Sequence, residues 1–208
     1  MSKFIVVEGL DGTGKTTQIK ILADYIRSKG DAVEITAEPT SHPTGKLIRR
    51  ILSGEVKSTP WALASLFLSD RIIHNKNEED GIDKMMKEGK TVISDRYYYS
   101  TFSYQGHETD LDWCMNMHFS CPEVRQPDLV LFLTMAPEKC VERIRANRPD
   151  EAIEIYENTE SLTKISRQFD TVFEKLKDRE NIVYIDADGT IDEVSQRLFS
   201  AYDEAFGE

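Results

Sequence analysis

The sequence predicts an α/β fold in which a five-stranded parallel sheet is covered by helices on both faces. Short apolar runs rich in β-branched residues alternate with stretches whose apolar residues recur at helical spacing, and this alternation is typical of parallel sheets. The first apolar run also leads through a glycine-rich loop into a helix, as in the strand–loop–helix units of such folds. A length of 208 residues suits a single domain, residues 1–208, with a substantial core.

Apolar runs and helix start and stop signals place the elements in order. The predicted strands are residues 4–7, 32–36, 91–94, 128–134 and 182–185. Thr59-Pro60 supplies an N-cap and a first-turn proline for a helix that runs towards His74. Thr190 and Glu193 have the spacing of a capping box for the last helix. The other predicted helices run from the glycine loop to Gly30, over 45–52, over 82–88, from Pro137 onwards, and over 162–176.

Residues 9–16 read Gly-Leu-Asp-Gly-Thr-Gly-Lys-Thr and match the phosphate-loop pattern G-x-x-x-x-G-K-[ST]. Glycines let the backbone wrap closely around a phosphate with its N–H groups turned inward, and the helix N-terminus adds its positive end. Lys15 supplies a cation for the outer phosphates, and the Thr16 hydroxyl suits Mg²⁺. Asp11 would repel phosphate, so we expect it to bind a metal or a sugar hydroxyl; the alternative is a solvated loop acid.

Composition excludes several classes of protein. The net charge is −11, with 26 basic and 37 acidic residues, which argues against nucleic-acid binding and against anionic membranes. No apolar run approaches the length of a membrane span, and no secretory signal precedes the first strand. Cys114, Cys121 and Cys140 lack the spacing of a zinc site or a disulfide framework. These features predict a soluble cytoplasmic protein.

Three short motifs each follow a predicted strand, and they should line one crevice. They are the phosphate loop, Glu38-Pro39 and Asp95-Arg96, and ligands of an open parallel sheet gather beyond the carboxyl ends of its strands. Asp95 ends an apolar strand as a Walker B carboxylate does, so we expect it to hold Mg²⁺ through water; the alternative is a cap or turn residue.

Phosphoryl transfer needs arginines beside a lysine and Mg²⁺, because charge neutralisation and positioning do most of the work. The sequence offers Arg71 on a helix, Arg96 at a strand end, and Arg143, Arg145 and Arg148 near a basic segment. Arginine suits phosphate because its guanidinium makes bidentate hydrogen bonds.

Two aromatic residues stand out beside these arginines. Phe67 lies one helical turn before Arg71, so its ring could stack on a base while the arginine bonds the base edge. Tyr104 is the second, and the other aromatics after Asp95 are expected in the core. The four histidines, His42, His74, His107 and His118, have no metal-ligand spacing and are interpreted as surface or core residues.

Two segments resemble motifs of guanine-nucleotide switches. They are Asn75-Lys76-Asn77-Glu78 and Asp186-Ala187-Asp188-Gly189, but their order is inverted and Glu78 stands where an aspartate belongs. A helix end and a strand-to-helix turn are the favoured interpretations.

The chain as a whole resembles the thymidylate kinases, close to their archaeal and bacterial branch. Residues 7–18 match the opening of the family almost throughout. Later matches are Glu38-Pro39, Phe67 with Asp70-Arg71, Asp95-Arg96-Tyr97 with Ser100, Tyr104 and Gln105, residues 126–129, and Asp186-Ala187. The phosphate loop alone does not choose among enzymes that contain it, whereas this combination is specific.

The resemblance implies a P-loop fold of nucleoside-monophosphate-kinase type, a homodimer, and the reaction of MgATP with dTMP to give ADP and dTDP. It implies Asp11 near the sugar 3′-hydroxyl, Phe67 on thymine, Arg71 at the base edge, Arg96 on the acceptor phosphate, Thr101 at the base, and Tyr104 guarding against a 2′-hydroxyl. Glu38, Pro39, Ser100 and Gln105 complete the dTMP set. The ATP set is Gly9, Leu10, Asp11, Gly12, Thr13, Gly14, Lys15, Thr16, Thr17 and Arg143, with Thr16 and Asp95 for the metal and Lys15, Asp11 and Arg96 as catalytic residues.

The sequence departs from the family pattern at two places. Some members carry a catalytic arginine in the phosphate loop, but residues 11–13 contain none. The family's other subtype carries this arginine in a lid, so the resemblance implies a short lid at about 143–157, with Arg143, Arg145 and Arg148 as candidates, Arg148 favoured and Arg145 next. Many members have arginine before Glu-Pro, where this chain has Ala37. Either Lys46 or Arg49 compensates, or acceptor binding is weaker.

Two other functions stay open at this point. One is another P-loop kinase acting on nucleotides or deoxynucleosides. The other, of a different class, is a nucleotide-binding switch without phosphoryl transfer, for which the two switch-like segments are the only support.

Overall fold

The computed structural model describes residues 1–147 and 158–207 and confirms the predicted fold class. Its five strands form one sheet in the order β2-β3-β1-β4-β5, and every neighbouring pair is parallel. The strands are β1 (Phe4–Gly9), β2 (Val33–Ala37), β3 (Thr91–Asp95), β4 (Leu129–Thr134) and β5 (Ile182–Asp186). Their carboxyl ends therefore lie along a single edge of the sheet, which is where ligands of such folds bind.

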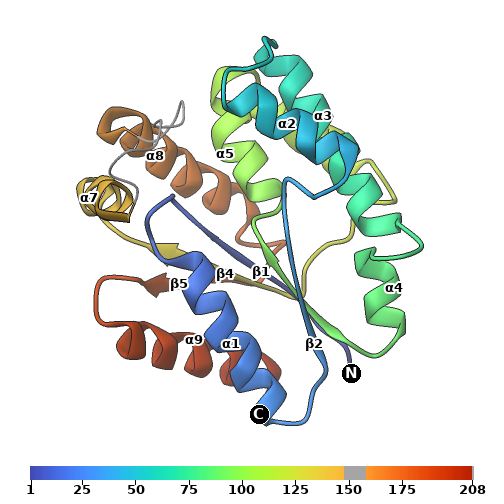
Figure 1. The fold of residues 1–208 in the computed structure, drawn as a ribbon, viewed down its shortest axis with the longest axis vertical. Helices are drawn as coiled ribbons and strands as arrows, with labels where there is room; N and C mark the ends of the chain where they lie inside the picture. The colour runs from blue at the N-terminus through green and yellow to red at the C-terminus, as the bar shows by residue number, and fades with distance from the viewer. Residues whose placement is uncertain (148–157, 208) are drawn as a thin grey trace.

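Helices cover both faces of the sheet (Figure 1). One face is covered by α1 (Lys15–Ser28) and α9 (Ile191–Phe206), which pack on each other and on the strands. On the other side, α5 (Tyr98–Glu108) packs on β1 and is itself contacted by α3, α6 and α8. The remaining helices in the described part of the chain are α2 (Pro43–Leu52), α3 (Pro60–Lys76), α4 (Ile82–Lys87), α6 (Leu111–Phe119), α7 (Pro137–Asn147) and α8 (Thr159–Leu176).

The core is centred on β1, whose residues 4–7 have no exposed surface. Its apolar side chains face helices on both sides, as expected for the central strand of a parallel sheet. The expected aromatic core is also present, because Tyr97, Tyr98, Tyr99 and Phe102 are all buried. The Tyr98 and Tyr99 hydroxyls each donate to Glu180 at 2.9 Å, so these rings serve packing rather than ligand binding.

The helices predicted from the sequence do not include α5 and α6. At the start of α5 no side chain caps the helix locally. Instead the Glu8 carboxylate of β1 accepts hydrogen bonds from the backbone N–H groups of Tyr97 and Ser100, both at 3.0 Å. Glu8 precedes the start of this helix by 89 residues, so the residues next to the helix do not reveal where it begins. The start of α6 does carry one, since the Asp110 side chain accepts from the Trp113 N–H at 2.7 Å.

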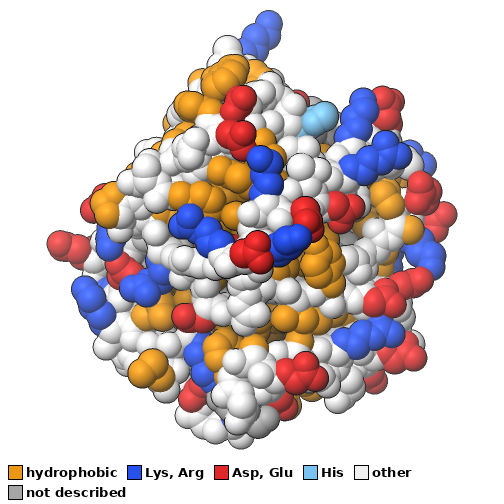
Figure 2. All heavy atoms as spheres, turned by 180° about the vertical axis from the view of Figure 1, so that it is seen from behind, with side chains coloured by type: hydrophobic (Ala, Val, Ile, Leu, Met, Phe, Trp, Pro, Cys, Tyr) orange, Lys and Arg blue, Asp and Glu red, His pale blue; other side chains and the backbone are white. Residues whose placement is uncertain are grey.

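Basic and acidic side chains are interspersed over the face shown in Figure 2, so the basic groups there form no continuous surface. Within residues 1–147 and 158–207, no helix combines the length and the apolar character that a membrane crossing requires.

Candidate active site

The phosphate loop joins β1 to the N-terminus of α1, and two of its glycines have no substitute. Gly12 has a φ of 88°, and a Cβ there would lie 2.4 Å from the Cys140 carbonyl oxygen of α7. Gly9 has a φ of 148°, and its Cβ would lie 2.6 Å from the Leu133 carbonyl oxygen of β4. Both the backbone conformation and the available space therefore require glycine. The close approach to α7 also ties the loop to the root of the predicted lid.

Lys15 and two oxygen ligands lie at the mouth of this loop. The buried Lys15 ammonium donates to the carbonyl oxygens of Gly9, at 3.1 Å, and Leu10, at 2.9 Å. Burial lowers the pKa of this ammonium. The Thr16 hydroxyl donates to Asp95 Oδ2 at 3.3 Å, so the two predicted Mg²⁺ ligands are adjacent. An Mg²⁺ ion held by these two side chains would take its other ligands from phosphate oxygens and water, as Mg²⁺ sites commonly do.

Two cavities meet at the carboxyl ends of the strands. The cavity beside the phosphate loop, called the donor cavity after its predicted ligand, has a volume of about 530 Å³ and is lined by residues 11–18, Asp95, Arg143, and the turn after β5. The second cavity, called the acceptor cavity after its predicted ligand, has a volume of about 440 Å³ and is lined by Pro39, Phe67, Arg71, Ser100, Tyr104 and Gln105, among others. Asp11, Glu38 and Arg96 line both cavities. Ligands in the two cavities would therefore share these three residues as neighbours.

Asp11, Arg96 and Tyr104 form a polar group where the cavities join. The Arg96 Nη2 donates to Asp11 Oδ1 at 2.6 Å, and the Tyr104 hydroxyl lies 3.4 Å from Asp11 Oδ2. The Arg96 guanidinium also donates to the Ser100 hydroxyl at 2.7 Å and lies 5.4 Å from the centre of the Tyr104 ring. Arg96 has a φ of 70°, an uncommon conformation for a residue other than glycine. Such strain is often found where a side chain is held for binding.

Glu8 supports this group from behind, and sequence reasoning assigned it no role. It is fully buried on β1. Its Oε1 accepts from the α5 amides, while Oε2 accepts from the Ser100 hydroxyl at 2.8 Å and lies 3.8 Å from Arg96 Nη1. Burial raises the pKa of this carboxyl, and the nearby Arg96 charge opposes the shift. A charged residue within a central apolar strand was the available sequence signal.

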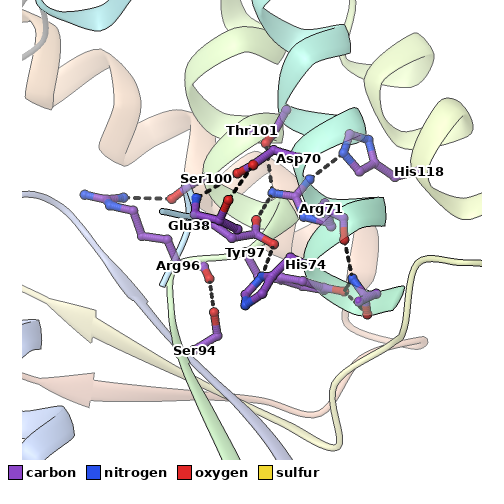
Figure 3. A network of polar contacts seen from close by, with 12 residues as sticks. Glu38, Asp70, Arg71, His74, Ser94, Arg96, Tyr97, Ser100, Thr101 and His118 are labelled. Atoms are coloured by element: carbon purple, nitrogen blue, oxygen red, sulfur yellow. Dashed lines mark hydrogen bonds and ion pairs between the residues drawn. The ribbon is translucent and has the colours of Figure 1, made fainter. Parts of the chain in front are cut away.

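Arg71 of α3 is the centre of a second, buried network (Figure 3). Its guanidinium donates to Glu38, to His118 Nε2 at 2.5 Å, and to the Thr101 hydroxyl at 3.3 Å. His74 Nδ1 lies 2.9 Å from the second Glu38 oxygen. Thr101 thus lies against Arg71, and it is absent from the residues that line the acceptor cavity.

The predicted lid arginines differ in their placement. Arg143 of α7 lines the donor cavity, whereas Arg145 is exposed and does not line it. Arg148 lies outside the described residues. At the position of the missing family arginine, Ala37 lines the donor cavity. Of its two proposed substitutes, Arg49 lines the acceptor cavity and donates to the carbonyl oxygens of Pro39 and Thr40, while the exposed Lys46 does not line it.

The turn after β5 lines the donor cavity and was interpreted from sequence only as a turn. Ala187, Gly189, Thr190 and Ile191 contribute to the cavity wall. Their position after a strand carboxyl end could have indicated this. The other switch-like segment is structural, since Asn75 Nδ2 donates to the Arg71 carbonyl oxygen at 2.7 Å and to the Tyr97 hydroxyl at 2.8 Å.

Comparison with known families agrees with this geometry. The family model described as thymidylate kinase matches residues 7–198. The chain belongs to the thymidylate kinase family. The resemblance inferred from its motifs is thereby confirmed.

Similar proteins come from bacteria and archaea, as predicted. A thymidylate kinase of Desulfotalea psychrophila is 40% identical over 172 residues, covering 82% of this chain and 81% of that protein. A probable thymidylate kinase of Thermococcus kodakarensis is 37% identical, covering 86% and 81% respectively. A probable thymidylate kinase of Methanococcus aeolicus is 35% identical, covering 95% and 94%.

Proposed function

We propose that this chain transfers the γ-phosphoryl group of ATP to the phosphate of dTMP, giving ADP and dTDP for dTTP synthesis. Membership of the thymidylate kinase family supports this reaction. The structural observation that carries it is the junction of the two cavities at Asp11 and Arg96. An in-line transfer needs donor and acceptor phosphates in contact at one cationic point, and Arg96, which lines both cavities, would supply that point.

The donor side would hold the triphosphate through the loop amides of residues 12–17 and the Lys15 ammonium, with Arg143 at the opposite wall. Lys15 is already buried beside the loop, so its charge would act in a weakly screened environment. Thr16 and Asp95 would hold Mg²⁺, which when bound neutralises charge on the β- and γ-phosphates.

The acceptor side would bind dTMP along the second cavity. We propose that Arg96 binds the acceptor phosphate and that Ser100 holds this arginine in place. Asp11 and Tyr104 would bind the sugar. Phe67 and Arg71 also line this cavity and would bind the base by stacking and by hydrogen bonding. Glu38, Pro39 and Gln105 complete the wall, and Thr101 would act on the base through Arg71.

The lid would supply the catalytic arginine that the phosphate loop lacks. We therefore expect Arg148→Ala to lower turnover by at least about 10³-fold, the usual range for such arginines, with dTMP affinity little changed. Single-turnover rates and dTMP titration measure the two effects. Arg145→Ala and Arg143→Ala serve as matched comparisons. An unaffected Arg148→Ala turnover would move the role to whichever of the other two variants is slow.

An acceptor panel tests the proposed function. ADP release is measured in a coupled assay with MgATP and dTMP, dUMP, dCMP, dGMP or AMP. We expect dTMP to be preferred, strongly over the purine monophosphates and modestly over dUMP, because one methyl group in an apolar pocket is worth about 1–3 kcal/mol. Activity on unphosphorylated thymidine would instead favour a deoxynucleoside kinase. Tight GTP binding without acceptor-dependent turnover would favour a switch.

We further propose a single domain over residues 1–208 with a short lid at about 143–157, a homodimer, and a cytoplasmic location. The length of the chain supports the single domain, its composition supports the location, and the family resemblance supports the lid and the homodimer.

A further inference from the structure

Arg71 is held by more partners than a base-binding arginine needs. Its side chain is fully buried although it lines the acceptor cavity. A guanidinium has five N–H donors and no acceptor. Those of Arg71 meet three protein acceptors, on Glu38, Thr101 and His118 (Figure 3). The Nε–H is buried without a partner in the described part of the chain. An unpaired buried donor is costly, so the three acceptors that the protein does supply are the contacts that fix the orientation of Arg71.

His118 of α6 presents an acceptor to this arginine. Its Nδ1 lies 2.8 Å from the Cys114 carbonyl oxygen, one turn earlier in the same helix. A carbonyl oxygen only accepts, so Nδ1 carries the hydrogen, and in the neutral ring Nε2 then offers its lone pair to Arg71 Nη1. Burial and then the Arg71 charge lower the pKa of His118 to about 3, which keeps the ring neutral.

The other side of the guanidinium is fixed through Glu38. One of its oxygens accepts from Arg71, and the other contacts His74 Nδ1 at 2.9 Å. His74 Nε2 in turn lies 2.6 Å from the Thr36 hydroxyl of β2. Because both carboxylate oxygens are engaged, Glu38 cannot rotate without breaking a hydrogen bond. Acceptors on either side therefore set the plane of the guanidinium.

We propose that His118 is a positioning residue for specificity: its neutral ring orients Arg71 so that the remaining N–H donors meet a carbonyl oxygen of the acceptor base. This inference rests on the proposed function and deepens it. Because Arg71 offers only donors, the oriented guanidinium matches an oxo group on a pyrimidine and mismatches an amino group at the same place. A tilted guanidinium would lose that discrimination while the catalytic groups around Lys15 stay in place.

Two substitutions separate the two hydrogen bonds of His118. In His118→Asn the amide nitrogen can replace Nδ1 and keep the bond to Cys114, but it does not reach Arg71. In His118→Gln the longer side chain places a carbonyl oxygen near the Nε2 position, which restores an acceptor for Arg71. We expect His118→Asn to raise KM for dTMP about tenfold, the effect of one charge-assisted hydrogen bond. The ratio of kcat/KM for dTMP to kcat/KM for dCMP should fall in His118→Asn, and kcat should change little. His118→Gln should recover most of the lost dTMP affinity and of the lost selectivity.

His107→Asn is the matched control, since His107 is an exposed histidine at the end of α5, and it should behave as wild type. Equal KM values in the Asn and Gln variants, or an unchanged base ratio in His118→Asn, would overturn the proposal. The ring nitrogens are read separately by ¹⁵N NMR of the wild-type protein. We expect an Nδ1–H tautomer that does not titrate between pH 5 and 8, and an Nε2–H tautomer would overturn the proposal even if both variants fail to fold. A wild-type protein that does not phosphorylate dTMP would instead refute the proposed function, with the tautomer still measurable.

Discussion

Lys15→Ala is expected to lower phosphoryl transfer by at least about 10²-fold while dTMP binding stays close to wild type. The ammonium lines the donor cavity and is absent from the acceptor cavity. It is buried against the phosphate loop, where its positive charge is weakly screened by solvent. A water molecule that fills the space left by Lys15→Ala would not supply that charge. Losing one preorganised charge-stabilising donor commonly costs this much in kcat.

Turnover under saturating MgATP and dTMP, with dTMP titration by calorimetry, measures both effects. Lys20→Ala is the control, because Lys20 is exposed on the same helix and should leave both values unchanged. Wild-type turnover in Lys15→Ala would show that the phosphate-loop assignment is wrong.

Arg96→Ala is expected to have the largest effect on the acceptor. We predict that KM for dTMP rises about 10²-fold, since truncating one partner of the desolvated pair that Arg96 would form with the acceptor phosphate costs about 2–5 kcal/mol. The same change leaves Asp11 and Glu8 without their nearest arginine, so thermal stability should also fall. ATP affinity should fall less, because Lys15 and the loop amides remain.

Arg96→Lys separates charge from geometry. A lysine keeps the charge but cannot contact Asp11 and Ser100 together as the guanidinium does, so an intermediate KM is expected. Arg167→Ala, at an exposed arginine of α8, controls for the loss of a surface charge. An unchanged KM for dTMP in Arg96→Ala, measured on protein shown to be folded, would contradict the assignment of Arg96 to the acceptor phosphate.

The parts of the site that sequence reasoning predicted are those set by local pattern. The phosphate loop is defined by glycines whose conformation the structure requires at Gly9 and Gly12. Asp95 and Arg96 were placed from one rule, that ligands meet the carboxyl ends of parallel strands, and the 3.3 Å contact between Thr16 and Asp95 agrees with it.

The parts that could not be predicted depend on contacts between distant residues. Glu8 caps α5 from 89 residues away, and His118 meets Arg71 across 47 residues. Neither spacing has a local signature, and a histidine without metal-ligand spacing is usually a surface or core residue. His118 is indeed in the core. Its proposed role depends on which of its two ring nitrogens carries the hydrogen, and no sequence pattern indicates this.

Acceptor-dependent ADP release tests the central claim most directly. The claim is that ATP bound in one of these cavities transfers a phosphoryl group to dTMP bound in the other. The decisive comparison is wild-type protein with MgATP and either dTMP or dGMP at equal concentration. We predict rapid ADP formation with dTMP, stoichiometric with dTDP, and turnover near background with dGMP. Equal rates with the two acceptors, or ADP formation that does not depend on dTMP, would contradict the account.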